Sequence, residues 1–223
     1  TDIAKLDLAA VTAFDAWRTA QSGKVPVQNT IKNHNSALNR VLDLAELNGW
    51  IVKSLRPTLL NKGVKTQSRG SFSVEEYRTI YSALRTFHKQ TPNEKSAATR
   101  ETLQNYVLFL ANTGIRHGTE ALGLRWRNIE WYLRDGERYL AVSVDGKTNK
   151  RTAIARDSVV DFLWRQAQLN SRITAGDFDG LISSKSDEPV FVTRLGAVVT
   201  VHNLNRAFNA LLDELDLKTG ADG

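Results

Sequence analysis

The sequence contains no cysteine and no methionine, and it has only four prolines in 223 residues. Without cysteine the chain can form neither a disulfide nor a thiolate metal site. The four histidines are too scattered along the chain to predict a zinc motif; they are His34, His88, His117 and His202. We therefore expect any chemistry to need neither a metal nor another cofactor. The lack of methionine and the opening Thr1 indicate a segment of a longer protein.

Long hydrophobic runs are also missing, since no apolar stretch approaches the roughly 20 residues that cross a bilayer. The first residues, TDIAKLDLAA, lack the basic and then apolar layout of a signal peptide. We expect a cytoplasmic protein without a membrane partner. A hydrophobic content of 41% with 24% charged residues is ordinary for a soluble globular protein. The length allows one large domain or two modest ones, and we expect two.

Acidic residues are scarce in the first third of the chain. Residues 1–72 carry ten Lys and Arg against five Asp and Glu, whereas residues 73–223 carry twenty against nineteen. A stretch without any acidic residue lies between Glu46 and Glu75. Its basic residues are Lys53, Arg56, Lys62, Lys65 and Arg69. The segment 61–72 is typical of a basic linker that follows a phosphate backbone, although a solvated loop has the same composition.

Two helices are predicted before this linker. The first has apolar residues at helical spacing up to the break at 23–26, namely Leu6, Val11, Phe14 and Trp17. The second covers about 30–48 and stops at Gly49, with Ile31, Leu38, Val41, Leu42 and Ala45 on one face. Its other face holds long polar side chains suited to phosphate and base contacts: Lys32, Asn33, Ser36, Asn39 and Arg40. A merely solvated face would look the same.

A second domain is predicted from residue 73 onward. Ser73 and Glu76 have the spacing of a capping box, and Phe72 and Tyr77 that of a hydrophobic staple. Further helices are expected up to Gly114, after a cap at Asp157, and around 204–215. Strands are expected at 140–144 and 151–154, where apolar residues alternate around Asp145-Gly146, and at 189–192. These patterns predict a mainly α fold, with a helical first domain (1–60) and an α+β second domain (73–223) that has a small antiparallel sheet.

The most specific string is LFLANTGIRHGTEALGLRWRNIEW, from 108 to 131. It resembles the first conserved box of the tyrosine site-specific recombinases of the phage-integrase family. In that box a helix ends at Thr-Gly, an arginine follows, and an acidic residue opens the next helix before a Leu-x-Trp. Arg116 takes the place of the arginine and Glu120 that of the supporting acidic residue. Glu120 departs from the pattern because it follows the arginine by four residues, where many members have three.

Arg116 can be interpreted physically in two ways. An arginine held just past a glycine helix stop can present two donors to one phosphate and stabilise the charge of a pentacoordinate transition state. In isolation, such an arginine more commonly caps the carbonyls at the end of a helix. The complete string favours the catalytic interpretation.

A second resemblance covers VSVDGKTNKRTAIA, from 142 to 155. It looks like the family's β-hairpin that carries a catalytic lysine on its turn, and Lys147 takes that position. The resemblance implies that Lys147 gives a proton to the departing 5′ oxygen during strand cleavage. Lys150 and Arg151 are then expected to contact DNA. Basic residues at a hairpin tip are otherwise common as simple solvated turns.

The segment 30–51 resembles the family's core-binding domain. The family implies a two-domain clamp around duplex DNA, in which Lys65 and Arg69 of the linker cross the backbone. It also implies integration or another recombination by a tyrosine that attacks a phosphodiester and forms a 3′-phosphotyrosyl link. Family members act as tetramers on DNA, so self-association is expected of the full-length protein.

The nucleophile and a His-x-x-Arg box are missing from the places that the family gives them. The tyrosines all precede or open the hairpin: Tyr77, Tyr81, Tyr106, Tyr132 and Tyr139. His202 and Arg206 imitate the box, but their spacing is four residues rather than three, and no tyrosine follows. We therefore expect a catalytic domain that is incomplete, which binds DNA but cannot cleave it. Two alternatives remain. One is a non-catalytic DNA-binding regulator derived from an integrase, and the other is a helical protein-interaction domain.

Overall fold

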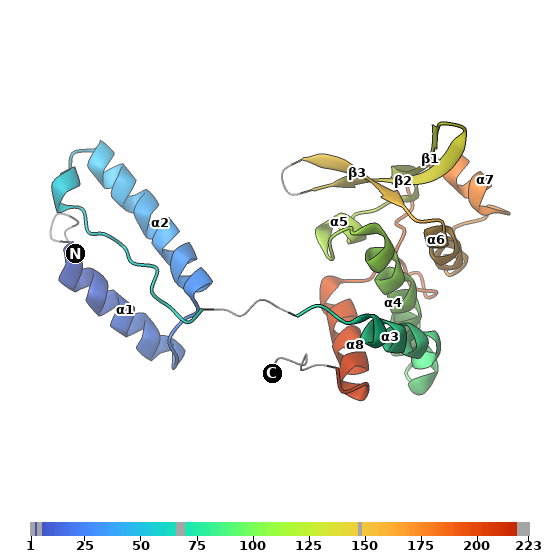
Figure 1. Ribbon diagram of the computed structural model, residues 1–223, viewed down its shortest axis with the longest axis horizontal. Helices are drawn as coiled ribbons and strands as arrows, with labels where there is room; N and C mark the ends of the chain where they lie inside the picture. Colours follow the sequence, from blue (N-terminus) through green and yellow to red (C-terminus); the bar gives the residue numbers. More distant parts are fainter. Residues whose placement is uncertain (1–2, 4–5, 66–69, 147–148, 218–223) are drawn as a thin grey trace. The chain divides into compact units, whose positions relative to one another are not determined.

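The structure is a computed structural model that describes residues 3, 6–65, 70–146 and 149–217. The chain divides into two compact units, Thr1–Arg69 and Gly70–Gly223. The elements of each unit are labelled in Figure 1. Each unit has its own helices and its own buried residues, so the two are described one at a time.

The first unit is built on two helices, α1 (Leu8–Ser22) and α2 (Gln28–Leu47), followed by a single 3₁₀ turn, η2 (Lys53–Leu55). The Asp7 carboxylate accepts a hydrogen bond from the Ala10 amide at 2.8 Å and so caps the start of α1. Gly23 ends this helix with a φ of 68°, a left-handed conformation that glycine adopts without steric cost. The helix predicted over 30–48 is confirmed as α2.

The segment after η2 returns along α2. The Val64 carbonyl accepts a hydrogen bond from the Gln28 amide at 2.9 Å, and the Asn35 side chain donates to the Leu60 carbonyl at 3.2 Å. Arg56 pairs with Asp43 at 2.6 Å. Residues up to Val64 are thereby fastened to the first unit.

The first unit leaves several large apolar side chains in contact with water. Phe14 is 39% exposed, Trp17 57% and Val41 52%, although the sequence predicts that each shares a helix face with other apolar residues. The buried apolar residues among its described residues are Val11, Ile31, Leu42, Ala45 and Pro57. Helical spacing shows which side chains share a face, but the two helices offer too little surface to cover that face.

The second unit is centred on α4 (Glu94–Thr113), which packs against α3 (Val74–Phe87), α6 (Ser158–Gln168) and α8 (Val201–Glu214). Shorter elements join them: η3 (His88–Gln90), α5 (Thr119–Leu122), η4 (Trp126–Asn128) and α7 (Phe178–Ser183). The predicted capping box of α3 is confirmed, because Ser73 and Glu76 each bind the other's backbone amide. Asp157 stands before α6 but makes no capping hydrogen bond with its side chain, contrary to prediction.

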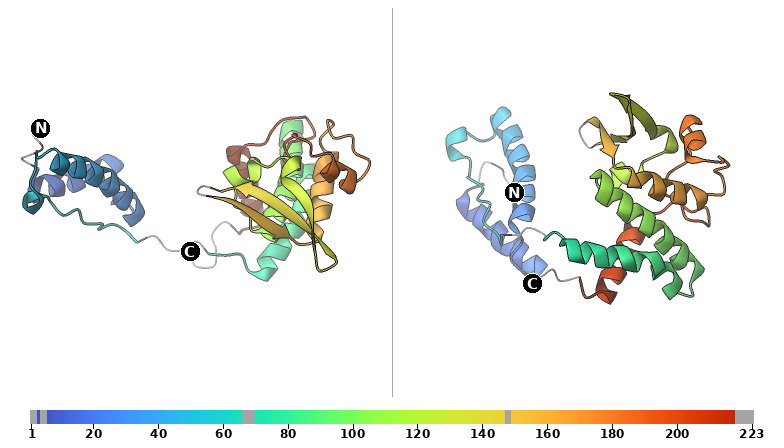
Figure 2. Two further views of the ribbon diagram at one scale, coloured as in Figure 1. Left: turned by 90° about the horizontal axis from the view of Figure 1, so that it is seen from above. Right: turned by 45° about the vertical axis from the view of Figure 1, so that its right-hand side comes forward.

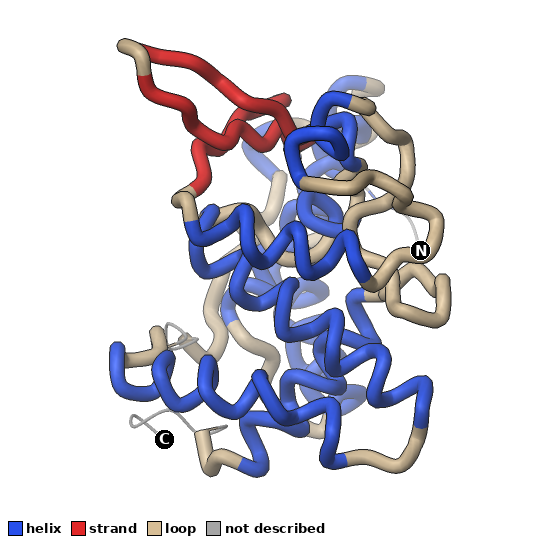
Figure 3. The backbone as a smooth tube through the Cα atoms, turned by 90° about the vertical axis from the view of Figure 1, so that its right-hand side faces the viewer, coloured by secondary structure: helices blue, strands red, loops and turns tan. Residues whose placement is uncertain are grey.

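Three antiparallel strands form the small sheet in the order β1 (Ile129–Arg134), β2 (Glu137–Asp145) and β3 (Lys150–Ala155). They lie side by side at one end of the second unit (Figures 2 and 3). The predicted hairpin is confirmed, with Asp145 paired to Lys150 at its tip. The strand predicted at 189–192 is wrong, because this segment makes only isolated bridges, at Pro189 and Val192.

A continuous apolar core joins the helices of the second unit to the inner face of the sheet. Its largest fully buried side chains include Trp126, Tyr106, Phe87 and Phe109. The fold class predicted from the sequence is confirmed: the chain is mainly helical, with an α+β second unit that contains a small antiparallel sheet.

Candidate DNA-binding and strand-cleavage site

The loop 114–118 joins α4 to α5 and carries Arg116. Gly114 ends α4 with a φ of 64°, and its amide donates to the Leu110 carbonyl at 3.0 Å. Gly118 has a φ of 95°, a value that side-chain-bearing residues rarely adopt. Two glycines thus bend the backbone on either side of Arg116, as the sequence predicted for the first of them.

The Glu120 carboxylate holds this loop in place. Its side chain is 6% exposed, and its oxygens accept hydrogen bonds from the Arg116 amide and the Arg116 guanidinium, each at 3.1 Å. Arg151 of β3 donates to the same carboxylate at 2.8 Å. These donors, Arg151 foremost, lower the pKa of Glu120 below its ordinary value, so the group is a carboxylate at neutral pH.

The Arg116 guanidinium remains available to a ligand. Its side chain is 74% exposed, and one of its terminal nitrogens, Nη1, is engaged by Glu120. The rest of the planar fork can therefore meet an anion without breaking that contact. A buried carboxylate that orients an exposed arginine produces a positioned cation, which is the requirement for binding a phosphate in a fixed orientation.

The tip of the hairpin lies close to the same carboxylate. A Cβ placed on Gly146 would be 3.5 Å from Glu120 Oε1 and 2.7 Å from the Asn149 carbonyl oxygen. Glycine is therefore required there by close packing. A cavity of about 480 Å³ opens between α5 and the two strands of the hairpin, and Glu120, Lys150 and Arg151 are among its lining residues. The arginine loop and the hairpin tip meet at Glu120, although Gly118 and Gly146 are 28 residues apart in sequence.

Tyr106 fastens the other side of the arginine loop. It is 2% exposed on α4, and its hydroxyl accepts a hydrogen bond from the Gly118 amide at 3.2 Å. The same hydroxyl lies 2.8 Å from His117 Nδ1. The direction of this hydrogen bond depends on the imidazole tautomer of His117, since the phenol oxygen can accept from both groups. This contact could not be predicted from the sequence, since Tyr106 has the spacing of an ordinary core residue.

The remaining predicted site residues fall into three groups. Lys32, Asn33 and Arg40 are exposed on α2, and Lys65 is exposed beyond it. Asn39 is partly buried, and its side-chain oxygen accepts from Arg56 at 3.1 Å, a contact that the sequence did not suggest. Lys147 and Arg69 lie outside the described residues. Of the predicted residues, the structure brings together Arg116, Glu120 and Arg151, with Lys150 nearby on the hairpin.

Comparison with known proteins gives one result for the architecture. The chain is similar to a solved structure of the Tn1549 transposon integrase in complex with a circular intermediate DNA, with a TM-score of 0.63 at 14% sequence identity. The similarity covers 97% of this chain and 67% of that one. The chain has an integrase fold.

At this identity the integrase comparison is evidence for the fold alone. No protein-family model matches the sequence, and no curated protein matches it. Within the described residues of this chain, every helix is too short or too polar to cross a bilayer.

Proposed function

We propose that this chain is the DNA-binding part, with an incomplete catalytic site, of a tyrosine recombinase that integrates or otherwise recombines DNA at specific sites. The observation that supports this most is the exposed Arg116 fork, held by buried Glu120 beside the tip of a basic hairpin. The integrase fold agrees with it, and the neighbour with that fold was solved with DNA. We assign residues 1–60 to a core-binding domain, 61–72 to a linker and 73–223 to the catalytic domain.

The proposed chemistry is a transesterification at one phosphodiester. Arg116 binds two non-bridging oxygens and stabilises the charge of the pentacoordinate transition state. A tyrosine oxygen, whose proton passes to water, forms a bond to phosphorus, and the bond from phosphorus to the 5′ oxygen breaks. Lys147 gives its proton to that departing oxygen. Glu120 contacts no DNA in this scheme but keeps Arg116 in position.

The chain itself is proposed to bind DNA without cutting it, because its tyrosines are unsuited to attack beside Arg116. Tyr106 is buried and its hydroxyl is engaged by Gly118 and His117, while burial also raises its pKa. Tyr132 and Tyr139 face each other across β1 and β2. They stand about 20 Å from the hairpin tip, given the rise of about 3.4 Å per strand residue. Tyr77 and Tyr81 belong to α3, and neither is among the described residues that line the cavity at Glu120; Tyr77 lines a separate, mainly apolar cavity with His117.

The remaining DNA contacts are assigned to the basic and amide side chains of the first unit and the hairpin. They are Lys32, Asn33, Asn39, Arg40, Lys65, Arg69, Lys150 and Arg151. Arg151 also has a structural role, since it donates a hydrogen bond to Glu120. Contacts of this kind to phosphates make binding depend steeply on salt. Tetramer formation on DNA is proposed for the full-length protein.

A salt titration of duplex DNA binding tests the proposal. We expect the affinity of the chain to fall by about 10³-fold between 50 and 200 mM salt if about six phosphates are contacted. A nicked duplex should form no covalent adduct with this chain. Binding that is absent or insensitive to salt would favour a protein-interaction domain instead, and an adduct would show that one of the five tyrosines is the nucleophile after all.

Experiments on a longer protein that contains this chain distinguish a recombinase from a non-catalytic DNA-binding regulator. In a recombinase, Arg116→Ala should reduce strand cleavage by about 10³-fold, because a positioned transition-state donor is lost, while DNA binding changes little. Arg134→Ala serves as the matched control, since it removes an exposed cation from the turn between β1 and β2 and has no assigned role in the site. If the unmodified longer protein never cleaves DNA, the non-catalytic regulator is the better explanation. The observation in its favour is that no tyrosine is among the described residues that line the cavity at Glu120.

A further inference from the structure

A cleft between the first turns of α4 and the middle of α8 has no part in the site described above. Its volume is about 420 Å³, and its lining includes three basic side chains, Lys95, Arg100 and Arg206. The other lining residues are small or neutral polar ones: Asn93, Ser96, Thr99, Asn203, Ala207 and Ala210. No acidic residue is among the described residues that line it. The cleft therefore concentrates positive charge from two helices.

The acidic residues nearest to the start of α4 pair with an arginine that does not line the cleft. Arg194 pairs with Glu94 at 3.1 Å and with Glu101 at 3.3 Å. One arginine offsets one of these two negative charges, and neither carboxylate is among the residues that line the cleft. Like charges that share a cleft repel one another, and an anion that enters it relieves this repulsion.

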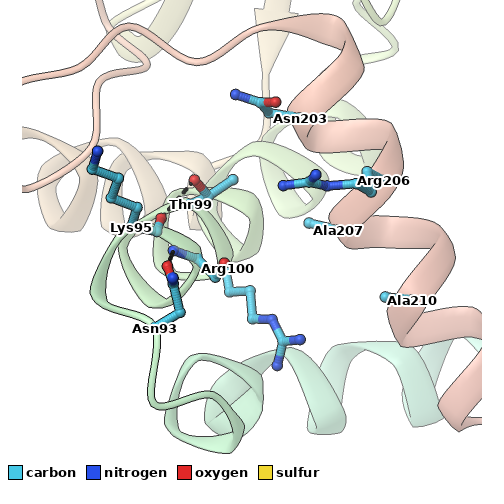
Figure 4. A pocket seen from close by; sticks show the side chains of 9 residues that line it. Asn93, Lys95, Thr99, Arg100, Asn203, Arg206, Ala207 and Ala210 are labelled. Carbon is cyan, nitrogen blue, oxygen red and sulfur yellow. Dashed lines mark hydrogen bonds between the residues drawn. The ribbon is translucent and has the colours of Figure 1, made fainter.

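The three cations differ in how firmly they are held. Arg100 is fixed, because it donates to the Phe87 carbonyl at 3.1 Å and its guanidinium lies 3.8 Å from the centre of the Phe87 ring. Arg206 and Lys95 are exposed, and neither has an ion pair or side-chain hydrogen bond to any other described residue. Figure 4 shows the Arg206 side chain reaching from α8 toward Thr99 of α4, with Asn203 one turn away. Two uncommitted donors thus border a cleft whose third cation is fixed.

The geometry points to a second anion site at this cleft, for a phosphate group. An arginine fork and a lysine ammonium are the side chains that bind phosphate best, and the amide of Asn203 adds a neutral donor. The site is separate from Arg116, since Thr99 lies about 21 Å from the end of α4 at Thr113, at about 1.5 Å per helical residue. The phosphate comes either from a nucleic-acid backbone, which rests on the proposed function, or from a free phosphate compound, which does not.

Thermal unfolding of the whole chain with inorganic pyrophosphate tests the site without DNA. At matched ionic strength, pyrophosphate at about ten times its Kd should raise the Tm of the unmodified chain by about 3 °C over chloride. The double variant Lys95→Gln/Arg206→Gln should lose this shift, and Arg206→Lys with Lys95 intact should keep part of it. Arg134→Gln is the matched control, because it removes an exposed cation from the β1–β2 turn, where no cleft residue lies.

Duplex DNA binding by the same variants identifies the source of the phosphate. If the cleft holds a backbone phosphate, the slope of log affinity against log salt should fall by about 0.9 for each lost contact in the double variant, and Arg134→Gln should leave it unchanged. An unchanged slope with a pyrophosphate shift assigns the cleft to a free phosphate compound. If pyrophosphate stabilises the unmodified chain no more than chloride does, and the DNA slope is unchanged, the site does not exist. If the chain binds no DNA but pyrophosphate still raises its Tm, the proposed function is refuted and the proposed anion site at the cleft stands.

Discussion

The two units differ in how far they bury their apolar side chains. In the second unit, residues at helical spacing meet a core that runs from α3 to the sheet, and Phe87, Phe109 and Trp126 are almost fully covered. In the first unit, two helices leave Trp17 and Leu47 exposed by 57% and 83%. A unit of this size buries a smaller share of its surface, so its stability is marginal. The candidate cleavage site belongs to the well-packed unit, which fits its need for fixed side chains.

Truncating one aromatic residue in each unit should give the largest difference between the units in the loss of unfolding free energy. Phe109→Ala should lower the free energy of unfolding of the second unit by about 3–5 kcal/mol, because it leaves a cavity in the core. Trp17→Ala should change that of the first unit by less than about 0.5 kcal/mol, since its side chain is largely in water. Urea titrations followed by hydrogen exchange report the two units separately. Equal losses in both would erase the contrast.

Glu120→Gln should have the next largest effect, within the second unit. Glu120 has its pKa lowered from an ordinary value of 4.5, so its interactions stabilise the fold above that pH and are lost as the pH falls through the lowered pKa. The Tm difference between the unmodified chain and Glu120→Gln should amount to a few degrees at pH 7 and shrink below about pH 4. Thermal melts across this range measure it, with Glu130→Gln as an exposed control. A difference independent of pH would show that the charge of Glu120 is unimportant.

Tyr106→Phe should sharpen the account of the arginine loop. It keeps the packing of the ring against Phe191 and removes the hydroxyl that binds Gly118 and His117. We expect a loss of about 1 kcal/mol and faster amide exchange at Gly118. Tyr139→Phe is the control, because its hydroxyl binds only exposed Glu137 among the described residues. Unchanged exchange at Gly118 would mean that the loop is held by Glu120 alone.

Lys150→Gln should have the smallest effect. Lys150 is 89% exposed, and its only described ion pair, to Asp145, measures 3.7 Å. Pairs of this kind contribute little, so the free energy of unfolding should change by less than about 0.5 kcal/mol. Chemical denaturation measures it, and the affinity for duplex DNA should still fall at low salt. A large loss of stability would show that Lys150 has a structural role rather than the proposed DNA-binding one.

The parts of the fold that local rules govern could be predicted from the sequence. The capping box of α3, the glycine stop of α4 and the β2–β3 hairpin each depend on a few neighbouring residues, and all three are present. The strand β1 and the short helix α7 were missed, because an outer strand with one buried residue and a single turn containing Gly180 give weak patterns. The exposure of Phe14 and Trp17 on α1 could not be predicted, because spacing alone does not say what covers a face.

The site could be predicted in part. Arg116 and Glu120 were found from one string, and the structure joins them. Two contacts that complete the arrangement connect distant parts of the chain, Arg151 to Glu120 and Tyr106 to Gly118. Neither has a local signature, since Arg151 resembled a hairpin cation and Tyr106 a core aromatic. Long-range partners of this kind follow from the packing of α4 and the hairpin.

A structure of this chain bound to duplex DNA tests the central claim most directly. The account predicts that nitrogens of Arg116 and Lys147 both lie about 3 Å from oxygens of one phosphate. It also predicts that Glu120 keeps its hydrogen bonds to Arg116 in that complex. If the two cations contact different phosphates, or if one of them faces away from the DNA, the assignment of this site to strand cleavage is contradicted.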